Sequence, residues 1–158
     1  MRTKFCAPNE IIAAEPVLAL REKLAAATGI YLTTENAEVA EKADIILLGV
    51  KPAVVLAVIK EIASQIGDKV VVSLAAGIRL ESMEPLADAR FMRAMTNTPA
   101  AIGRAATALA SGSRTTREDL AKATEIFVSI GAVVEIDEEQ IDAVTALAGS
   151  RPAFVYSV

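Results

Sequence analysis

The feature that most constrains the fold is the short apolar run at residues 45–48, which Gly49 and the Lys51-Pro52 pair follow almost at once. A run this short and apolar on both faces is typical of a buried strand in a parallel sheet. Because proline favours the first turn of a helix, the pattern from Pro52 to Gln65 predicts a helix directly after the strand. The same break excludes a membrane-spanning helix here, since such a helix needs about 20 apolar residues.

The strand-turn-helix pattern recurs along the whole chain, which predicts an α/β fold with a doubly wound, mostly parallel sheet. Strands are expected at residues 10–14, 30–33, 44–50, 69–74, 89–94, 106–111 and 132–136. Helices are expected from Glu15-Pro16 to Gly29 and at residues 35–43, 52–65, 81–86, 116–130 and 138–147, with Thr34 as a possible cap of the second and Thr115 or Thr116 of the fifth. The strand at residues 106–111 is expected to return from the turn that precedes it.

Composition supports this fold class and excludes several functions. The 158 residues are 53% hydrophobic and only 4% aromatic, as expected for aliphatic helices packed on a parallel sheet. A net charge of −4 without a long basic run argues against nucleic acid as a partner. The chain has no histidine and a single cysteine, Cys6, so neither a disulfide nor a zinc cluster is expected. A reducing cytoplasm fits this composition.

Three predicted strands end in turns of small or polar residues, where doubly wound folds bind ligands. The turns are Gly49 to Pro52, Ser73 to Gly77 and Thr96 to Pro99. Each turn also has a purely structural explanation. The alternative for Lys51 is a solvated turn lysine, and the alternative for Thr96 to Pro99 is a plain Asx turn. For Ser73 to Gly77, tight strand-helix packing is an equal alternative.

Together these turns, with Arg93-Ala94-Met95 before the third, resemble the nucleotide-binding domain of pyrroline-5-carboxylate reductase. The resemblance implies hydride transfer from NADPH or NADH to the C=N bond of 1-pyrroline-5-carboxylate, which gives proline. It implies these cofactor-binding residues: Asn36, Gly49, Val50, Lys51, Pro52, Leu74, Ala75, Ala76 and Asn97. Helix capping is an equal alternative for Asn36. Glu15 either hydrogen-bonds a ribose 2′-hydroxyl, which would disfavour the 2′-phosphate of NADPH, or is simply a first-turn residue of a helix. The choice between NADH and NADPH therefore stays open.

The sequence departs from the family pattern at the glycine-rich turn. No two of the eight glycines are two residues apart, so the Gly-x-Gly-x-x-Gly fingerprint is absent from the printed chain. We therefore expect an N-terminally truncated domain, without its central strand, that is inactive alone. The strands at residues 10–14 and 44–50 then either pair directly, receive residues 1–6 between them, or receive another chain. Open sheet edges of this kind also favour self-association.

The C-terminal stretch at residues 142–154 resembles the family's junction into its helical domain, with Arg151 where glycine is expected. The predicted organisation is an incomplete dinucleotide-binding domain at residues 1–150 and the start of a truncated helical domain at residues 151–158. No catalytic and no metal-binding residue is predicted. The alternatives are a non-catalytic remnant or interaction module with this fold, and a member of the wider β-hydroxyacid dehydrogenase or imine reductase group.

Overall fold

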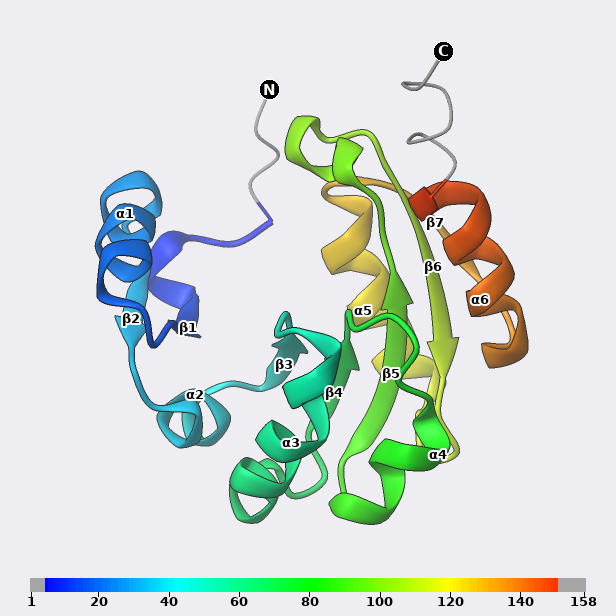
Figure 1. Cartoon of the computed structure of the whole chain (residues 1–158), viewed down its shortest axis with the longest axis horizontal. Coiled ribbons are helices and arrows are strands. Elements are labelled where there is room, and N and C mark those ends of the chain that lie inside the picture. The colour runs from blue at the N-terminus through cyan, green and yellow to red at the C-terminus, as the bar shows by residue number, and fades with distance from the viewer. Residues whose placement is uncertain (1–4, 151–158) are drawn as a thin grey trace.

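The computed structural model describes residues 5–150 and confirms the α/β class. Its main sheet has five strands in the order β3-β4-β5-β6-β7, and a second, two-stranded sheet pairs β1 with β2 (Figure 1). The strands are β1 (Ile12–Ala14), β2 (Tyr31–Thr33), β3 (Ile45–Leu48), β4 (Val70–Ser73), β5 (Arg90–Met95), β6 (Ala105–Ser111) and β7 (Gly131–Glu135). All neighbours are parallel except β5 and β6, so β6 returns from the turn after β5, as the sequence predicts.

Helices alternate with these strands along the chain. The α-helices are α1 (Leu18–Thr28), α2 (Asn36–Lys42), α3 (Pro52–Ile66), α4 (Leu80–Met83), α5 (Arg117–Val128) and α6 (Ile141–Val144). The remaining helical turns are η1 (Pro8–Glu10), η2 (Glu84–Leu86), η3 (Thr98–Ile102), η4 (Glu138–Gln140) and η5 (Thr145–Ser150). No helix among residues 5–150 combines the length and the apolar character that crossing a membrane requires.

The two faces of the main sheet carry separate clusters of buried side chains. On one face, Ile46 of β3 and Phe91 of β5 pack with Ile59 of α3. On the other face, Met92 of β5 packs with Phe127 of α5. Alternate strand residues therefore face opposite helix layers, which explains why the apolar runs are continuous rather than alternating.

Two local predictions are wrong. α1 begins at Leu18 rather than in the Glu15-Pro16 turn, because Val17 is its extended N-cap residue. Thr34 does not cap α2; Glu35 is the N-cap, and the Thr34 hydroxyl donates to its carboxylate instead. The helical stretch expected at residues 138–147 is confirmed, and it consists of η4, α6 and the start of η5.

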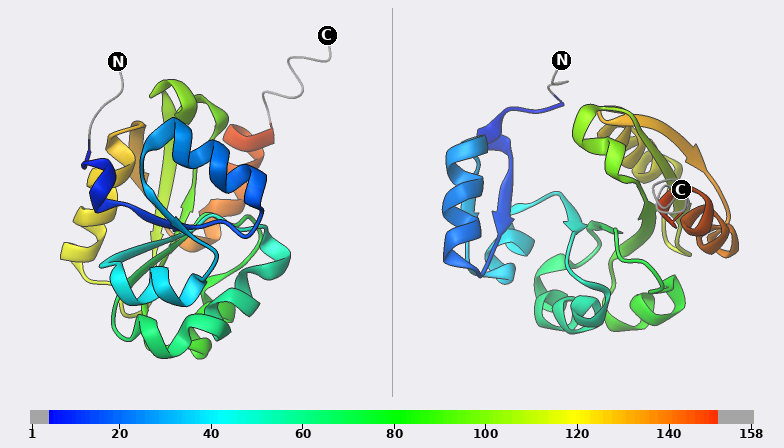
Figure 2. Two further views of the ribbon diagram at one scale, coloured as in Figure 1. Left: turned by 90° about the vertical axis from the view of Figure 1, so that its left-hand side faces the viewer. Right: turned by 45° about the horizontal axis from the view of Figure 1, so that its top comes forward.

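The interruption expected in the sheet is present. β1 and β3 do not pair, so the β1–β2 sheet and the main sheet are separate, and Figure 2 shows the first with α1 apart from the second. Phe5 and Cys6 adopt no strand, and residues 1–4 lie outside the described range. Of the three ways of closing the interruption, direct pairing is therefore excluded. The predicted segment at residues 151–158, including Arg151, also lies outside the described residues.

Candidate functional site

Three turns lie together at the carboxyl edge of the main sheet. β3, β4 and β5 are adjacent and parallel, so the turns that follow them meet at one edge (Figure 1). These are the turns at residues 49–52, 74–77 and 96–99, which contain eight of the nine residues that the sequence assigns to cofactor binding. The edge is where open α/β sheets hold ligands.

The first turn leads from β3 directly into α3. Pro52 is the first helical residue, as the sequence predicts, and Lys51 is the N-cap residue. The carbonyl of Lys51 accepts a hydrogen bond from the Val54 N–H at 3.0 Å, which closes the first turn, while the Lys51 side chain is exposed. Gly49 borders open space, since a Cβ built there would meet no heavy atom within 4 Å. The backbone at Gly49 is thus accessible to a ligand.

The second turn continues the ladder between β3 and β4. The N–H of Leu74 donates to the carbonyl of Leu48 at 3.1 Å, and the N–H of Ala75 donates to the buried hydroxyl of Ser73 at 3.3 Å. Ala75 is buried and Ala76 is exposed at the same edge. Gly77 has φ of 74°, a left-handed conformation that glycine adopts without strain. These hydrogen bonds hold the backbone of the turn in place. Its exposed residues, Ala76 and Gly77, are small, so a ligand can approach the backbone closely.

The third turn is braced against β6 by its own polar side chains. Oδ1 of Asn97 accepts a hydrogen bond from the Ala106 N–H at 2.9 Å, and the buried Thr107 hydroxyl donates to that of Thr96 at 3.0 Å. The Asn97 amide is therefore oriented by the backbone of the returning strand. Within the described part of the chain its Nδ2 group has no hydrogen-bond acceptor, so it is free to donate to a ligand.

Asn36, the ninth predicted residue, lies elsewhere. Its Nδ2 donates to the Glu61 carboxylate on α3 at 3.1 Å. Glu61 is about 13 Å along the helix axis from Pro52, at 1.5 Å per residue. Asn36 is thus held beside the body of α3 rather than at the turn. Glu15 lies before α1 rather than in its first turn, and its carboxylate accepts a hydrogen bond from the Val17 N–H at 2.9 Å.

A buried ion pair on β5 was not predicted. The Arg93 side chain is only 3% exposed and contacts the Glu138 carboxylate at 3.0 Å. The same carboxylate oxygen accepts from the Leu80 N–H at 2.7 Å, and Asp142 lies 3.9 Å from the guanidinium. A charge within an apolar strand was the only sequence signal for this cluster. It attaches η4 and α6 to the main sheet and to the start of α4.

Acidic side chains outside the turns have shifted pKa values. Burial would raise the pKa of Asp119, but hydrogen bonds from Thr116 and the charge of Arg90 outweigh burial and lower it. The pKa of Glu38 is lowered to about 2, first by its hydrogen bond with Lys42 and then by those with Thr33 and Tyr31. These carboxylates stabilise helix ends and helix surfaces, and neither lies at the carboxyl edge.

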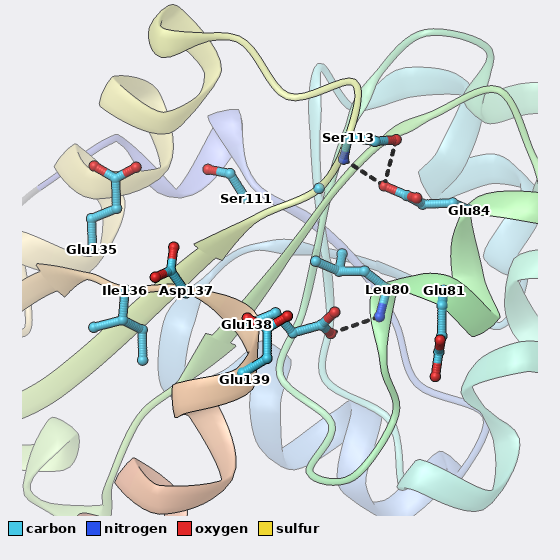
Figure 3. Close-up of a pocket in the computed structure, with 11 residues that line it drawn as sticks. Leu80, Glu81, Glu84, Ser111, Ser113, Glu135, Ile136, Asp137, Glu138 and Glu139 are labelled. Carbon is cyan, nitrogen blue, oxygen red and sulfur yellow. Dashed lines mark hydrogen bonds between the residues drawn. The ribbon is translucent and has the colours of Figure 1, made fainter.

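Two cavities in the described part of the chain lie away from the three turns. The first, of about 410 Å³, is strongly acidic (Figure 3), and its lining residues are Leu80, Glu81, Glu84, Ser111, Gly112, Ser113, Glu135, Ile136, Asp137, Glu138 and Glu139. Two of these carboxylates already bind backbone N–H groups, of Leu80 and Ser113. The second cavity lies at the amino ends of β3, β4 and β5. Among the residues described, no group of acidic, histidine and cysteine side chains suits a metal ion.

Parallel strands with helices on both faces, whose carboxyl ends carry small and polar turns, define a Rossmann-like α/β fold. The model of the family "NADP oxidoreductase coenzyme F420-dependent" matches residues 2–77. A pyrroline-5-carboxylate reductase of Methanosarcina acetivorans is 38% identical over 96% of this chain and 57% of its own length. The chain thus spans little more than half the length of the curated relatives it matches.

Solved structures agree with this class. A pyrroline-5-carboxylate reductase from Coxiella burnetii has a TM-score of 0.86 at 30% identity, over 94% of this chain and 57% of that one. A Plasmodium falciparum pyrroline carboxylate reductase with NADP bound has a TM-score of 0.77 at 29% identity, over 82% and 50%. The chain is thus similar, over nearly its whole length, to about half of a pyrroline-5-carboxylate reductase.

Proposed function

We propose that this chain forms the cofactor-holding part of a pyrroline-5-carboxylate reductase, and that NADPH or NADH binds at the carboxyl edge of β3, β4 and β5. The observation that carries the proposal is the meeting of three small or polar turns at that edge. The names of the matched relatives support the substrate, 1-pyrroline-5-carboxylate, and the product, proline. Bound NADP in the Plasmodium falciparum enzyme supports the cofactor.

The residues of the edge suit a flat, polar ligand. Gly49 and Gly77 both border open space, and the exposed Ala76 presents only a methyl group. The free Nδ2 of Asn97 supplies a donor whose direction is set by the Ala106 N–H. These residues would bind and orient the nicotinamide side, and the exposed Lys51 ammonium would face the phosphates. A reduced nicotinamide would supply the hydride, which is chemistry of the cofactor rather than of the protein.

The printed chain offers no Gly-x-Gly turn for the pyrophosphate. We therefore expect the 158-residue chain alone to bind the cofactor weakly and to form no proline. Measurable proline formation by the purified chain would contradict this expectation. The lone Cys6 supports a location in a reducing cytoplasm.

Calorimetric titration with NADPH and NADH, with sedimentation of the same sample, tests the proposed site. Ala76→Glu places a carboxylate at the edge and should weaken cofactor binding by about tenfold or more through repulsion of the phosphates. Ala57→Glu, at an exposed position of α3, is the matched control and should leave binding unchanged. Equal affinities in the two variants would reject this edge as the site. Absence of binding by the folded parent chain would favour the non-catalytic alternative.

A further inference from the structure

Two threonine hydroxyls are in contact at the carboxyl end of β5. Thr96 directly follows β5, and its hydroxyl oxygen lies 3.0 Å from that of Thr107 on β6. The two strands are antiparallel with Met95 opposite Ala108, so the threonines are the next cross-strand pair. Thr107 is only 2% exposed, whereas Thr96 is partly exposed at the edge. The pair therefore connects the buried sheet with the proposed cofactor site.

Burial decides which of the two hydroxyls donates. The distance suits either direction, since each hydroxyl is both a donor and an acceptor. Within residues 5–150, however, the Thr107 hydroxyl contacts no other acceptor. A buried O–H group without an acceptor costs more free energy than an exposed one, which bonds to water. Thr107 therefore donates, and the oxygen of Thr96 accepts.

The hydrogen of the Thr96 hydroxyl then remains available for a ligand. Its neighbour Asn97 is in the same condition, because Oδ1 accepts from the Ala106 N–H at 2.9 Å while Nδ2 has no acceptor in the described part of the chain. In both side chains the oxygen is bonded to β6 and a donor is unpaired. The end of β5 therefore favours a ligand atom that accepts hydrogen bonds.

A nicotinamide carries such an atom, the oxygen of its carboxamide group. We propose that the Thr96 hydroxyl donates to this oxygen, and that Thr107 is a positioning residue that holds the Thr96 hydroxyl for this contact. The proposal rests on the proposed function, which places the nicotinamide side beside Asn97 and the phosphates near Lys51. It adds an orientation to that site, with the carboxamide oxygen directed to the end of β5.

Two relatives of the cofactor isolate this contact. The thionicotinamide analogue of NADP⁺ has sulfur, a weak acceptor, in place of the carboxamide oxygen and is otherwise the same. 2′-Phosphoadenosine diphosphoribose lacks the nicotinamide altogether and retains the phosphates. A contact with the carboxamide oxygen therefore affects the affinity for NADP⁺, but not the affinity for the fragment.

Calorimetric titration of the 158-residue chain with these three ligands tests the contact. Thr96→Val should weaken NADP⁺ binding by about three- to tenfold and leave binding of the fragment unchanged. Thr96→Ser keeps the hydroxyl and should bind NADP⁺ as the parent does. Sulfur should weaken binding to the parent and have little effect in Thr96→Val. An equal loss for NADP⁺ and the fragment, or an equal effect of sulfur in both proteins, would overturn the proposal.

Urea unfolding without any ligand tests the direction of the hydrogen bond. Thr96→Val leaves the buried Thr107 O–H without an acceptor, so the equilibrium constant for unfolding should rise by about tenfold. Thr107→Val removes the buried donor itself, and that constant should rise by less than about threefold, because the Thr96 hydroxyl then bonds to water. The double variant should be close to Thr107→Val. A larger loss in Thr107→Val than in Thr96→Val would overturn the assigned direction.

The two kinds of failure are distinguishable. A parent chain that binds NADP⁺ no more tightly than the fragment would overturn the carboxamide contact and leave a phosphate-binding edge in place. A folded parent chain that binds neither ligand would overturn the proposed cofactor site together with this contact. Binding of both ligands, with the loss in Thr96→Val confined to NADP⁺, would support both.

Discussion

The ion pair between Arg93 and Glu138 predicts an unequal response to the loss of its two partners. Glu138→Ala leaves the guanidinium, which is 3% exposed, without its main counter-charge, and leaves the Leu80 N–H without its acceptor. Loss of one partner of a buried pair costs about 3–5 kcal/mol, and an unpaired buried N–H about 1–3 kcal/mol. Because Asp142 remains 3.9 Å from the guanidinium, we expect the two costs together to lie at the low end of their sum, at about 4 kcal/mol of unfolding free energy.

Arg93→Met has a smaller expected cost. It removes the buried charge itself and fills the space with an apolar chain, while Glu138, 23% exposed, keeps the Leu80 N–H as its donor. We expect a cost of about 1 kcal/mol for this variant. The double variant should lose about 3 kcal/mol, which corresponds to a coupling energy of about 2 kcal/mol.

Urea unfolding of the five-stranded sheet, followed by circular dichroism, measures these free energies. A loss in Arg93→Met equal to or greater than that in Glu138→Ala would refute the reasoning, because it would mean that the guanidinium needs no counter-charge. A double variant whose loss equals the sum of the single losses would refute the coupling. The slope of the free energy with urea should be the same in all four proteins.

Three further changes test the local structure. Gly131→Ala should cost more than about 3 kcal/mol in urea unfolding, because its Cβ would lie against the Ala105 backbone; a near-neutral result would contradict this contact. Thr116→Ala should lower the free energy of unfolding by about 1 kcal/mol. It should also raise the pKa of Asp119, because the Asp119 carboxylate accepts hydrogen bonds from the Thr116 hydroxyl and N–H, and only the hydroxyl is lost; an unchanged pKa by NMR would contradict the cap. The Glu38 pKa, lowered from 4.5 to about 2, makes its stabilising contribution complete above pH 4.5 and lost as the pH falls toward 2. A carboxyl NMR midpoint near 4.5 would contradict that lowering.

Local chemistry was sufficient to predict much of the fold. Gly29 ends α1 in a left-handed conformation, and Thr116 caps α5, each as its residue type favours. The turn from Thr96 to Pro99 returns the chain to β6, antiparallel to β5. The three turns lie at one edge because β3, β4 and β5 are adjacent and parallel, and this strand order is known from the structure.

The wrong and missing predictions have tertiary causes. Pro16 suits a helix first turn, but the Glu15 carboxylate binds the Val17 N–H and delays the helix to Leu18. The partners Arg93 and Glu138 are 45 residues apart, so no local pattern joins them. The Asn36 contact with Glu61 depends likewise on how α2 packs against α3.

The separation of β1 and β2 from the main sheet sets the order in which the molecule opens. α1 has no buried residue, and the strands it covers share no ladder with β3. Opening residues 12–33 therefore exposes little apolar surface and requires less free energy than opening β4 or β5, whose side chains are mostly buried. A protease at low concentration should cut first in this segment, and the five-stranded sheet should remain as the resistant fragment.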